Sequence, residues 1–98
     1  MEIDVQPTLA DGLAGNLDPD TMTFDIVRRD VARIAVVNED QLREAIAGVM
    51  QNERLVVEGA GAVGVAALLS ARLEVRGKRV AVVLSGANID QGTLSEIV

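Results

Sequence analysis

Three glycines near the middle of the chain have the spacing of a phosphate-binding motif. Gly59, Gly61 and Gly64 match the pattern G-x-G-x-x-G, between a short apolar run and a helical pattern. In dinucleotide-binding folds this pattern brings a pyrophosphate to the N-terminus of a helix. One hypothesis for this chain is therefore a small dinucleotide-binding module.

The neighbouring sequence opposes nucleotide binding in two ways. A dinucleotide site needs an Asp or Glu at the end of the next strand to bind the ribose hydroxyls, whereas the next apolar run ends in Ser85-Gly86. Glu58 would place a carboxylate beside the pyrophosphate, which is electrostatically unfavourable. Close packing of a helix rich in small residues, within residues 55–69, is the better explanation of the glycines.

A second candidate site is the loop formed by Ser85, Gly86, Ala87 and Asn88. It follows the apolar run at residues 79–84, which is typical of a buried strand. Ligands of open parallel sheets bind beyond the C-terminal ends of the strands, so this loop is the best-placed candidate site. From residue type alone, Ser85 is equally suited to a turn or a helix cap.

Composition limits the classes of function. The 98 residues are enough for one domain at most, with a modest core built from Val, Leu, Ile and Ala because Phe24 is the only aromatic residue. Nine basic and fifteen acidic residues give a formal net charge of −6, which repels nucleic acid. We expect no nucleic-acid partner.

The residue types that are missing exclude further chemistry. Without cysteine or histidine the chain has no disulfide, no thiolate metal site and no histidine-dependent catalysis of its own. The first residues lack the pattern of a signal peptide, and the longest uncharged apolar run, at residues 59–69, is shorter than the roughly 20 residues that span a bilayer. We expect a cytoplasmic protein without a membrane partner.

The clearest predicted helix covers residues 39–52. Asn38 is suited to cap it, and its apolar residues follow the spacing of one helical face. Glu39 and Arg43 lie four residues apart on the other face, where the simplest interpretation is a solvated surface pair.

The remaining pattern alternates helices with runs of β-branched residues, which predicts an α/β fold with a partial open parallel sheet and covering helices. Short runs of this kind between helical segments are typical of buried parallel strands. The expected elements are the end of a strand at residues 1–5, a helix from about 21 to 29, a strand at 33–37, the helix at 39–52, a short strand and a Gly-rich turn followed by a helix ending near 71–73, a strand at 79–84, and a helix capped by Asp90.

The chain as a whole resembles the pyridoxal-phosphate (PLP) dependent serine/threonine dehydratases, the threonine ammonia-lyase group. The resemblance implies that residues 1–98 form a single segment, the C-terminal portion of the large, cofactor-binding domain of a fold type II enzyme. The matching segments are TLADGLAG at residues 8–15, MTFDIVRRDV at 22–31, VVEGAGAVGVAALL at 56–69 and VVLSGANID at 82–90.

The resemblance also implies roles for five residues. Ser85 matches the hydroxyl residue that hydrogen-bonds the pyridine nitrogen of PLP, and Gly86, Ala87 and Asn88 complete that loop. A hydroxyl does not force a proton onto the ring nitrogen as a carboxylate would, so the ring is a weaker electron sink, which suits β-elimination of water better than transamination. Glu58 matches an acidic residue near the cofactor ring, although a carboxylate favoured by the helix dipole explains it equally well.

Other parts of the family's active site do not occur in these 98 residues. The family binds the cofactor phosphate with a separate Gly-rich loop and forms a Schiff base with a lysine in an N-terminal motif. The only lysine here, Lys78, precedes the predicted strand at 79–84 and so lies at the opposite end from Ser85. We therefore expect no catalytic residue in this chain, and PLP bound in the complete enzyme but not by this chain alone.

We also predict no metal site. In the family's cation-binding members, acidic side chains flank the loop after the first strand. The matching region here offers Gln6, Ala10 and Gly12, and Asp11 is the one weak candidate.

The sequence thus predicts a fragment of an L-threonine or L-serine dehydratase, which converts its substrate to a 2-oxo acid and ammonia by β-elimination. Its partners would be the remaining N-terminal part of the catalytic domain and further copies of the same protein in a homo-oligomer. The alternatives are the dinucleotide-binding module and a non-catalytic fragment that self-associates through exposed strand edges.

Overall fold

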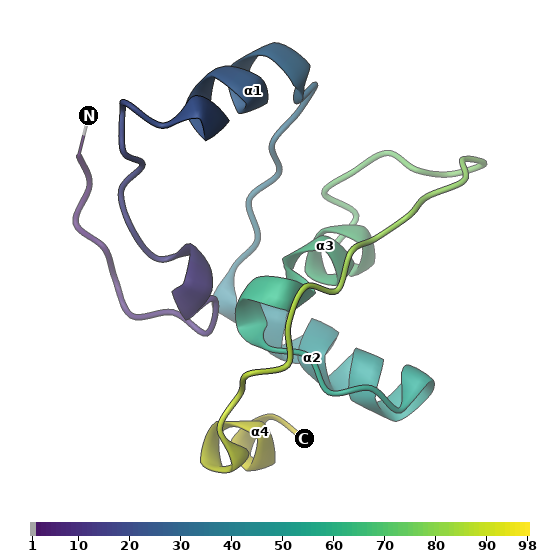
Figure 1. Cartoon of the computed structure of the whole chain (residues 1–98). Coiled ribbons are helices and arrows are strands. Elements are labelled where there is room, and N and C mark those ends of the chain that lie inside the picture. Colours follow the sequence, from purple (N-terminus) through teal and green to yellow (C-terminus); the bar gives the residue numbers. More distant parts are fainter. Residues whose placement is uncertain (1) are drawn as a thin grey trace.

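The computed structural model describes residues 2–98, and the regular structure in that range is helical (Figure 1). No helix in this range is long and apolar enough to cross a lipid bilayer. The elements are a short 3-10 helix, η1 (Asp11–Leu13), and the α-helices α1 (Met22–Asp30), α2 (Glu39–Glu53), α3 (Gly59–Leu69) and α4 (Gln91–Ile97).

Helix α2 confirms the predicted helix at residues 39–52 and its cap. The Asn38 side chain accepts the Gln41 N–H at 2.9 Å, and the Gln41 side chain accepts the Asn38 N–H at 2.8 Å. This reciprocal capping box satisfies two backbone donors at the start of the helix. At the other end, Arg54 adopts a left-handed conformation with φ of 58° and stops the helix.

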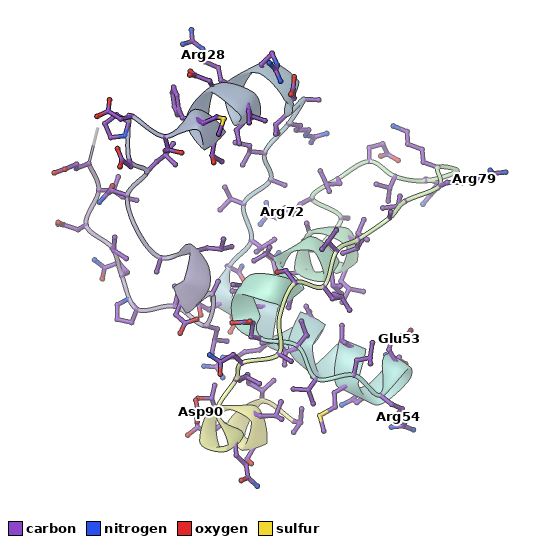
Figure 2. All side chains as sticks on the ribbon, viewed as in Figure 1. Arg28, Glu53, Arg54, Arg72, Arg79 and Asp90 are labelled. Atoms are coloured by element: carbon purple, nitrogen blue, oxygen red, sulfur yellow. The ribbon has the colours of Figure 1, made fainter. Side chains whose placement is uncertain are left out.

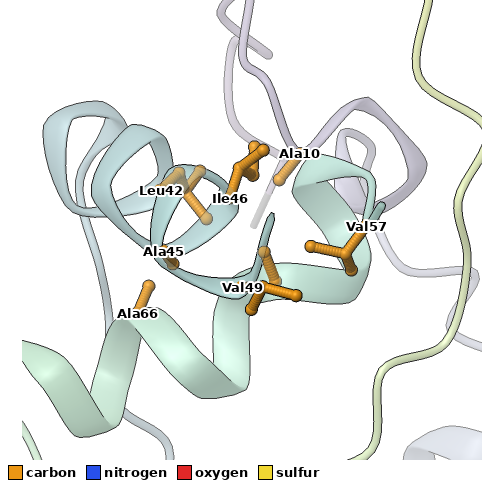
Figure 3. Close-up of a cluster of buried hydrophobic side chains, with 8 residues drawn as sticks. Ala10, Leu42, Ala45, Ile46, Val49, Val57 and Ala66 are labelled. Carbon is orange, nitrogen blue, oxygen red and sulfur yellow. The ribbon is translucent and has the colours of Figure 1, made fainter. Parts of the chain in front are cut away.

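Helix α3 packs against α2 and forms most of the core with it (Figure 3). The α3 side of this contact consists of small residues, so the two helix backbones approach closely. Val57, just before α3, is also fully buried. The buried apolar residues are Ala10, Leu42, Ala45, Ile46, Val49, Val57, Ala62, Ala66 and Ala67.

The three other predicted helices are also present in the structure. The glycine motif was expected in a turn, but helix α3 begins at Gly59, so all three glycines lie inside the helix, which ends at Leu69. Helix α1 begins after Thr21, whose hydroxyl accepts the Thr23 N–H at 3.0 Å. Helix α4 begins after Asp90, as predicted.

The predicted α/β fold with a partial open parallel sheet is wrong for this structure. Residues 2–98 contain no β-strand, although residues 33–37 and 79–84 are apolar and β-branched. A strand requires a neighbour that supplies ladder hydrogen bonds, and in Figure 1 these two segments run as separate, unpaired stretches of chain. The run at residues 1–5 is likewise not a strand over residues 2–5, and Met1 lies outside the described residues.

Unpaired apolar segments leave an unusually large surface. The solvent-accessible area is 7657 Å², whereas a compact monomer of this mass exposes roughly 5,400 Å². The radius of gyration is 14.4 Å, above the roughly 13 Å of a compact domain of this length, and one dimension is only 19 Å. Ile34, Val36 and Val83 are each more than three-quarters exposed.

Helix α1 lies apart from the core (Figure 1). Within the described residues it packs against no other helix. Phe24, Val27 and Val31, which have the spacing of one apolar face, are all exposed. The core that positions the candidate site is therefore the α2–α3 pair with the loop around Ala10.

Candidate functional site

The loop that starts at Ser85 is attached to the beginning of helix α3. The Glu58 N–H donates a hydrogen bond of 3.0 Å to the Gly86 carbonyl oxygen, and within the loop the Ile89 N–H donates to the Ala87 carbonyl oxygen at 2.9 Å. Glu58 is the N-cap residue of α3, so this bond links the cap of the helix to the loop. Gly86 is half-buried, whereas Ser85, Ala87 and Asn88 are exposed.

Glycines on both sides allow this close approach. A Cβ atom at Gly61 would lie 3.1 Å from both the nitrogen and the oxygen of Gly86, and one at Gly64 would lie 2.8 Å from a Val82 methyl group. A Cβ atom at Gly86 would overlap the Glu58 carboxylate. The glycines of α3 therefore serve packing against residues 82–86, as the sequence suggested.

The first glycine of the motif does not face an open phosphate site. A Cβ atom at Gly59 would overlap the backbone carbonyl group of Leu9. In a dinucleotide site the pyrophosphate approaches the second glycine of the motif, whereas here the Gly86 backbone lies against that residue, Gly61. This arrangement opposes the dinucleotide hypothesis more directly than the sequence did.

Glu58 and Asn88 line a small polar cleft of about 130 Å³ at the start of α3. The structure brings together two of the five predicted cofactor residues here. The same cleft is lined by Thr8, Leu9, Asp11, Gly59, Ile89, Asp90 and Thr93.

Ser85 lies on a different hollow. It lines an apolar groove of about 440 Å³ between α3 and residues 80–83. Leu13, Ala60 and Val63 also line this groove. Ser85 and Glu58 are thus joined through Gly86 but face neighbouring spaces.

Asp90, which borders the polar cleft, acts as a helix cap. Its carboxylate accepts the Thr93 N–H at 2.9 Å and the Thr93 hydroxyl at 2.5 Å. The Thr93 hydroxyl and, next, the Thr93 N–H lower the pKa of the Asp90 carboxyl from its ordinary value of 3.8. Figure 2 shows Asp90 where the loop enters α4.

No group of three or more carboxylates in residues 2–98 is arranged to hold a metal ion. Asp11, the weak candidate from the sequence, lines the polar cleft together with Glu58 and Asp90.

Lys78 belongs to the far end of the segment that leads to Ser85. Its neighbour Arg79 lies at the outer tip of the connection between α3 and this segment, well away from Asp90 and α4 (Figure 2). Extended chain from residue 79 to residue 84 spans well over 10 Å.

Glu39 is the functional candidate that the sequence did not indicate. Its carboxylate accepts the Leu9 N–H at 2.8 Å and the Thr8 hydroxyl. The Leu9 N–H contributes most, followed by the Thr8 hydroxyl, to lowering the pKa of the Glu39 carboxyl from 4.5, and Arg43 adds a smaller effect. The partners lie 30 and 31 residues away along the chain, so no local pattern could identify the contact.

Comparison with known proteins decides the family. A family model described as "Pyridoxal-phosphate dependent enzyme" matches residues 1–86 of the chain. The chain belongs to the pyridoxal-phosphate dependent enzyme family. Enzymes of this family depend on PLP, the cofactor that the sequence predicted for the complete enzyme.

Curated relatives confirm the resemblance to the threonine ammonia-lyase group. The L-threonine ammonia-lyase of Thermotoga maritima is 44% identical over 96 residues, covering 98% of this chain and 23% of that protein. The L-threonine dehydratase catabolic TdcB of Escherichia coli (strain K12) is 39% identical over 92 residues, covering 92% of this chain and 28% of that protein. An L-threo-3-hydroxyaspartate ammonia-lyase of Pseudomonas is 37% identical over 90 residues, covering 92% of this chain and 28% of that protein. The chain spans about a quarter of the length of these relatives.

The residues present fit one part of PLP. A pyridine ring is apolar on both faces and has one polar atom at its edge, and the groove has an apolar lining with one hydroxyl residue, Ser85. No lysine lines this groove in the described structure, and its apolar walls are unsuited to a phosphate. The match is therefore to the ring and not to the phosphate or the covalent attachment.

Proposed function

We propose that residues 1–98 are a single segment, the C-terminal portion of the catalytic domain of a PLP-dependent L-threonine or L-serine dehydratase. The observation that carries the proposal is the placement of the Ser85 loop. The loop is bound through Gly86 to the cap of α3, and its Ser85 lines an apolar groove. Family membership and the relatives named above support the same assignment.

PLP, when bound, supplies the electron sink that allows β-elimination. The Ser85 hydroxyl would hydrogen-bond the ring nitrogen without forcing a proton onto it. The Gly86 backbone, attached to Glu58 and packed on Gly61, would fix the position of that hydroxyl relative to α3. Glu58 would border the cofactor loop at the polar cleft, which Asn88 of that loop also lines.

This chain would complete its site only with a partner segment. The lysine that binds the cofactor and accepts the substrate's α-proton would come from the N-terminal part of the catalytic domain. We therefore propose that the chain alone is inactive and holds no PLP, that the complete protein is a homo-oligomer, and that it acts in the cytoplasm.

A chimera tests this function. The matched segment of the Thermotoga maritima L-threonine ammonia-lyase is replaced by this chain, and 2-oxo acid release is measured with L-threonine, L-serine and L-threo-3-hydroxyaspartate. We expect release from L-threonine or L-serine by the chimera and none by the chain alone. A folded chimera that binds PLP but releases no 2-oxo acid contradicts the proposal.

Substitutions at Ser85 test its role in the same chimera. Ser85→Ala should lower kcat/KM about tenfold through the loss of one hydrogen bond, whereas Ser85→Thr keeps a hydroxyl and should retain most of the activity. Equal loss in both variants would mean that the position requires a small side chain and not a hydroxyl.

A second candidate function, self-association of the chain alone, is favoured by the exposed apolar segments. Val36 and Val83 are 79% and 81% exposed and lie on unpaired, extended chain. Sedimentation velocity should show oligomers that weaken in Val36→Lys and Val83→Lys, because charges on an open edge oppose strand pairing. A monodisperse monomer at high concentration would exclude this candidate.

A further inference from the structure

The loop beside the cofactor residues is held by a carboxylate from α2. The two oxygens of Glu39 accept separate donors, the Leu9 N–H at 2.8 Å and the Thr8 hydroxyl. The Thr8 oxygen in turn accepts the Ala10 N–H at 3.1 Å. We call these four residues, Thr8, Leu9, Ala10 and Glu39, the loop clamp.

The loop clamp ends at the start of α3. The Leu9 carbonyl group lies directly against Gly59, so closely that a Cβ atom there would overlap it. The preceding residue, Glu58, donates its N–H to Gly86. A continuous chain of contacts therefore runs from Glu39 through Leu9 and α3 to the Ser85 loop.

The polar cleft depends on the same contacts. Thr8 and Leu9 line the cleft together with Glu58 and Asn88. Displacement of Leu9 would open the cleft and release the backbone that presses on Gly59. Glu39 does not line the cleft, so its effect on the cleft passes through Thr8 and Leu9.

Glu39 neither caps α2 nor forms an ion pair in the described structure. Asn38, not Glu39, caps α2 through the capping box. Arg43, one turn later on α2, makes no ion pair with Glu39, since the ion pair found within residues 2–98 joins Arg29 and Asp30. What distinguishes Glu39 from Asp40, the other carboxylate in the first turn of α2, is its contact with the loop.

We propose that Glu39 is a positioning residue for the cofactor site, acting through Thr8 and Leu9 on the Glu58–Gly59 end of α3 and so on the Ser85 loop. The link to the cofactor rests on the function proposed above. The loop clamp itself is a property of this chain and is testable without PLP.

The first experiment uses the 98-residue chain and follows backbone amide signals by NMR. Glu39→Ala should move the amide signals of Glu58, Gly59 and Asn88, whereas Asp40→Ala, which removes the same charge from the same helical turn, should leave them in place. Glu39→Gln keeps a side-chain oxygen for the Leu9 N–H and should restore most of the original positions. Equal shifts in the Glu39→Ala and Asp40→Ala variants would overturn the clamp.

The second experiment uses the chimera and measures PLP affinity by cofactor absorbance, together with kcat and KM. Glu39→Ala should weaken PLP binding about fivefold, less than the loss of a buried hydrogen bond to a charged group because Glu39 is exposed, and Asp40→Ala should change it less than about twofold. Thr8→Val combined with Glu39→Ala should weaken binding by less than the product of the single effects, because both remove one clamp. A role in stability alone would leave PLP affinity unchanged while lowering the free energy of unfolding.

The two experiments separate the two proposals. An inactive chimera that binds no PLP, together with NMR shifts specific to Glu39, rejects the dehydratase assignment and retains the clamp. An active chimera whose PLP affinity is the same in the Glu39→Ala and Asp40→Ala variants rejects the positioning role and retains the dehydratase assignment.

Discussion

Helices α2 and α3 differ from the extended segments at residues 33–37 and 79–84 in the contacts that each needs from the rest of the protein. Both regions contain aliphatic side chains, but Leu42 and Ile46 of α2 are almost fully buried against α3, whereas Ile34 and Val36 are more than three-quarters exposed. A helix makes its backbone hydrogen bonds within one segment and needs a partner only for its apolar face. An extended segment needs a partner for its backbone as well.

The largest expected effect contrasts one buried and one exposed aliphatic side chain. Leu42→Ala should destabilise the chain by about 2 to 5 kcal/mol, because it leaves a cavity between α2 and α3. Ile34→Ala should change the free energy of unfolding by no more than about 0.5 kcal/mol. Urea denaturation followed by circular dichroism measures both. Similar values for the two variants would mean that residues 33–37 are buried in solution.

The second effect concerns the contact between α3 and the loop. Gly61→Val should destabilise by about 1 to 3 kcal/mol, because the new side chain meets the backbone of Gly86. Gly15→Val is the control, since a Cβ atom there meets nothing within 4 Å. Thermal denaturation compares them. A stable, folded Gly61→Val variant would contradict the close packing of α3 on residues 82–86.

The third effect compares two helix caps. Asn38→Ala should lower the free energy of unfolding by about 1 kcal/mol, because α2 is part of the core. Thr21→Ala removes an equivalent cap from α1, which packs against no other helix in the described structure. It should reduce local helicity, seen in carbon chemical shifts, with little change in global stability. Equal destabilisation by the two substitutions would mean that α1 unfolds together with the α2–α3 core.

The smallest effect is the pH dependence of the loop clamp. Since the Leu9 N–H, the Thr8 hydroxyl and Arg43 lower the pKa of Glu39 in the folded chain, the unfolded chain binds a proton more readily. The stabilisation by Glu39 is therefore complete above its ordinary pKa of 4.5 and is lost as the pH falls below that value. The difference in stability between the native chain and Glu39→Gln, measured from pH 7 to pH 3, should shrink in that direction. A difference that grows as the pH falls would contradict the assignment.

Local signals predicted the helices well. The stripe of residues 42, 45, 46 and 49 and the cap at Asn38 are short-range features, and the structure contains both. The glycine motif was correctly explained by packing, but its position inside α3 was not predicted. G-x-G-x-x-G describes spacing and does not say where a helix begins.

The parts that sequence could not predict depend on distant contacts. The runs at 33–37 and 79–84 have strand composition, but pairing requires a neighbour that no local pattern reveals. The clamp of Thr8 and Leu9 on Glu39 crosses 30 residues in the same way. For the candidate site, the family resemblance indicated Glu58 and Ser85. Only the structure shows that Glu58 lines the polar cleft and Ser85 lines the apolar groove.

The short connection between α2 and α3 has a consequence for the order of folding. Only five residues, 54–58, separate the two helices, so the core contacts of this pair join positions close in the chain and carry a small loop-closure entropy. We expect α2 and α3 to pack together in the nascent chain soon after both helices have left the ribosome. Residues 33–37 would still be unpaired at that stage. If α2 and α3 pack together early, the loops at Thr8 and Gly86 can pack against a surface that is already formed.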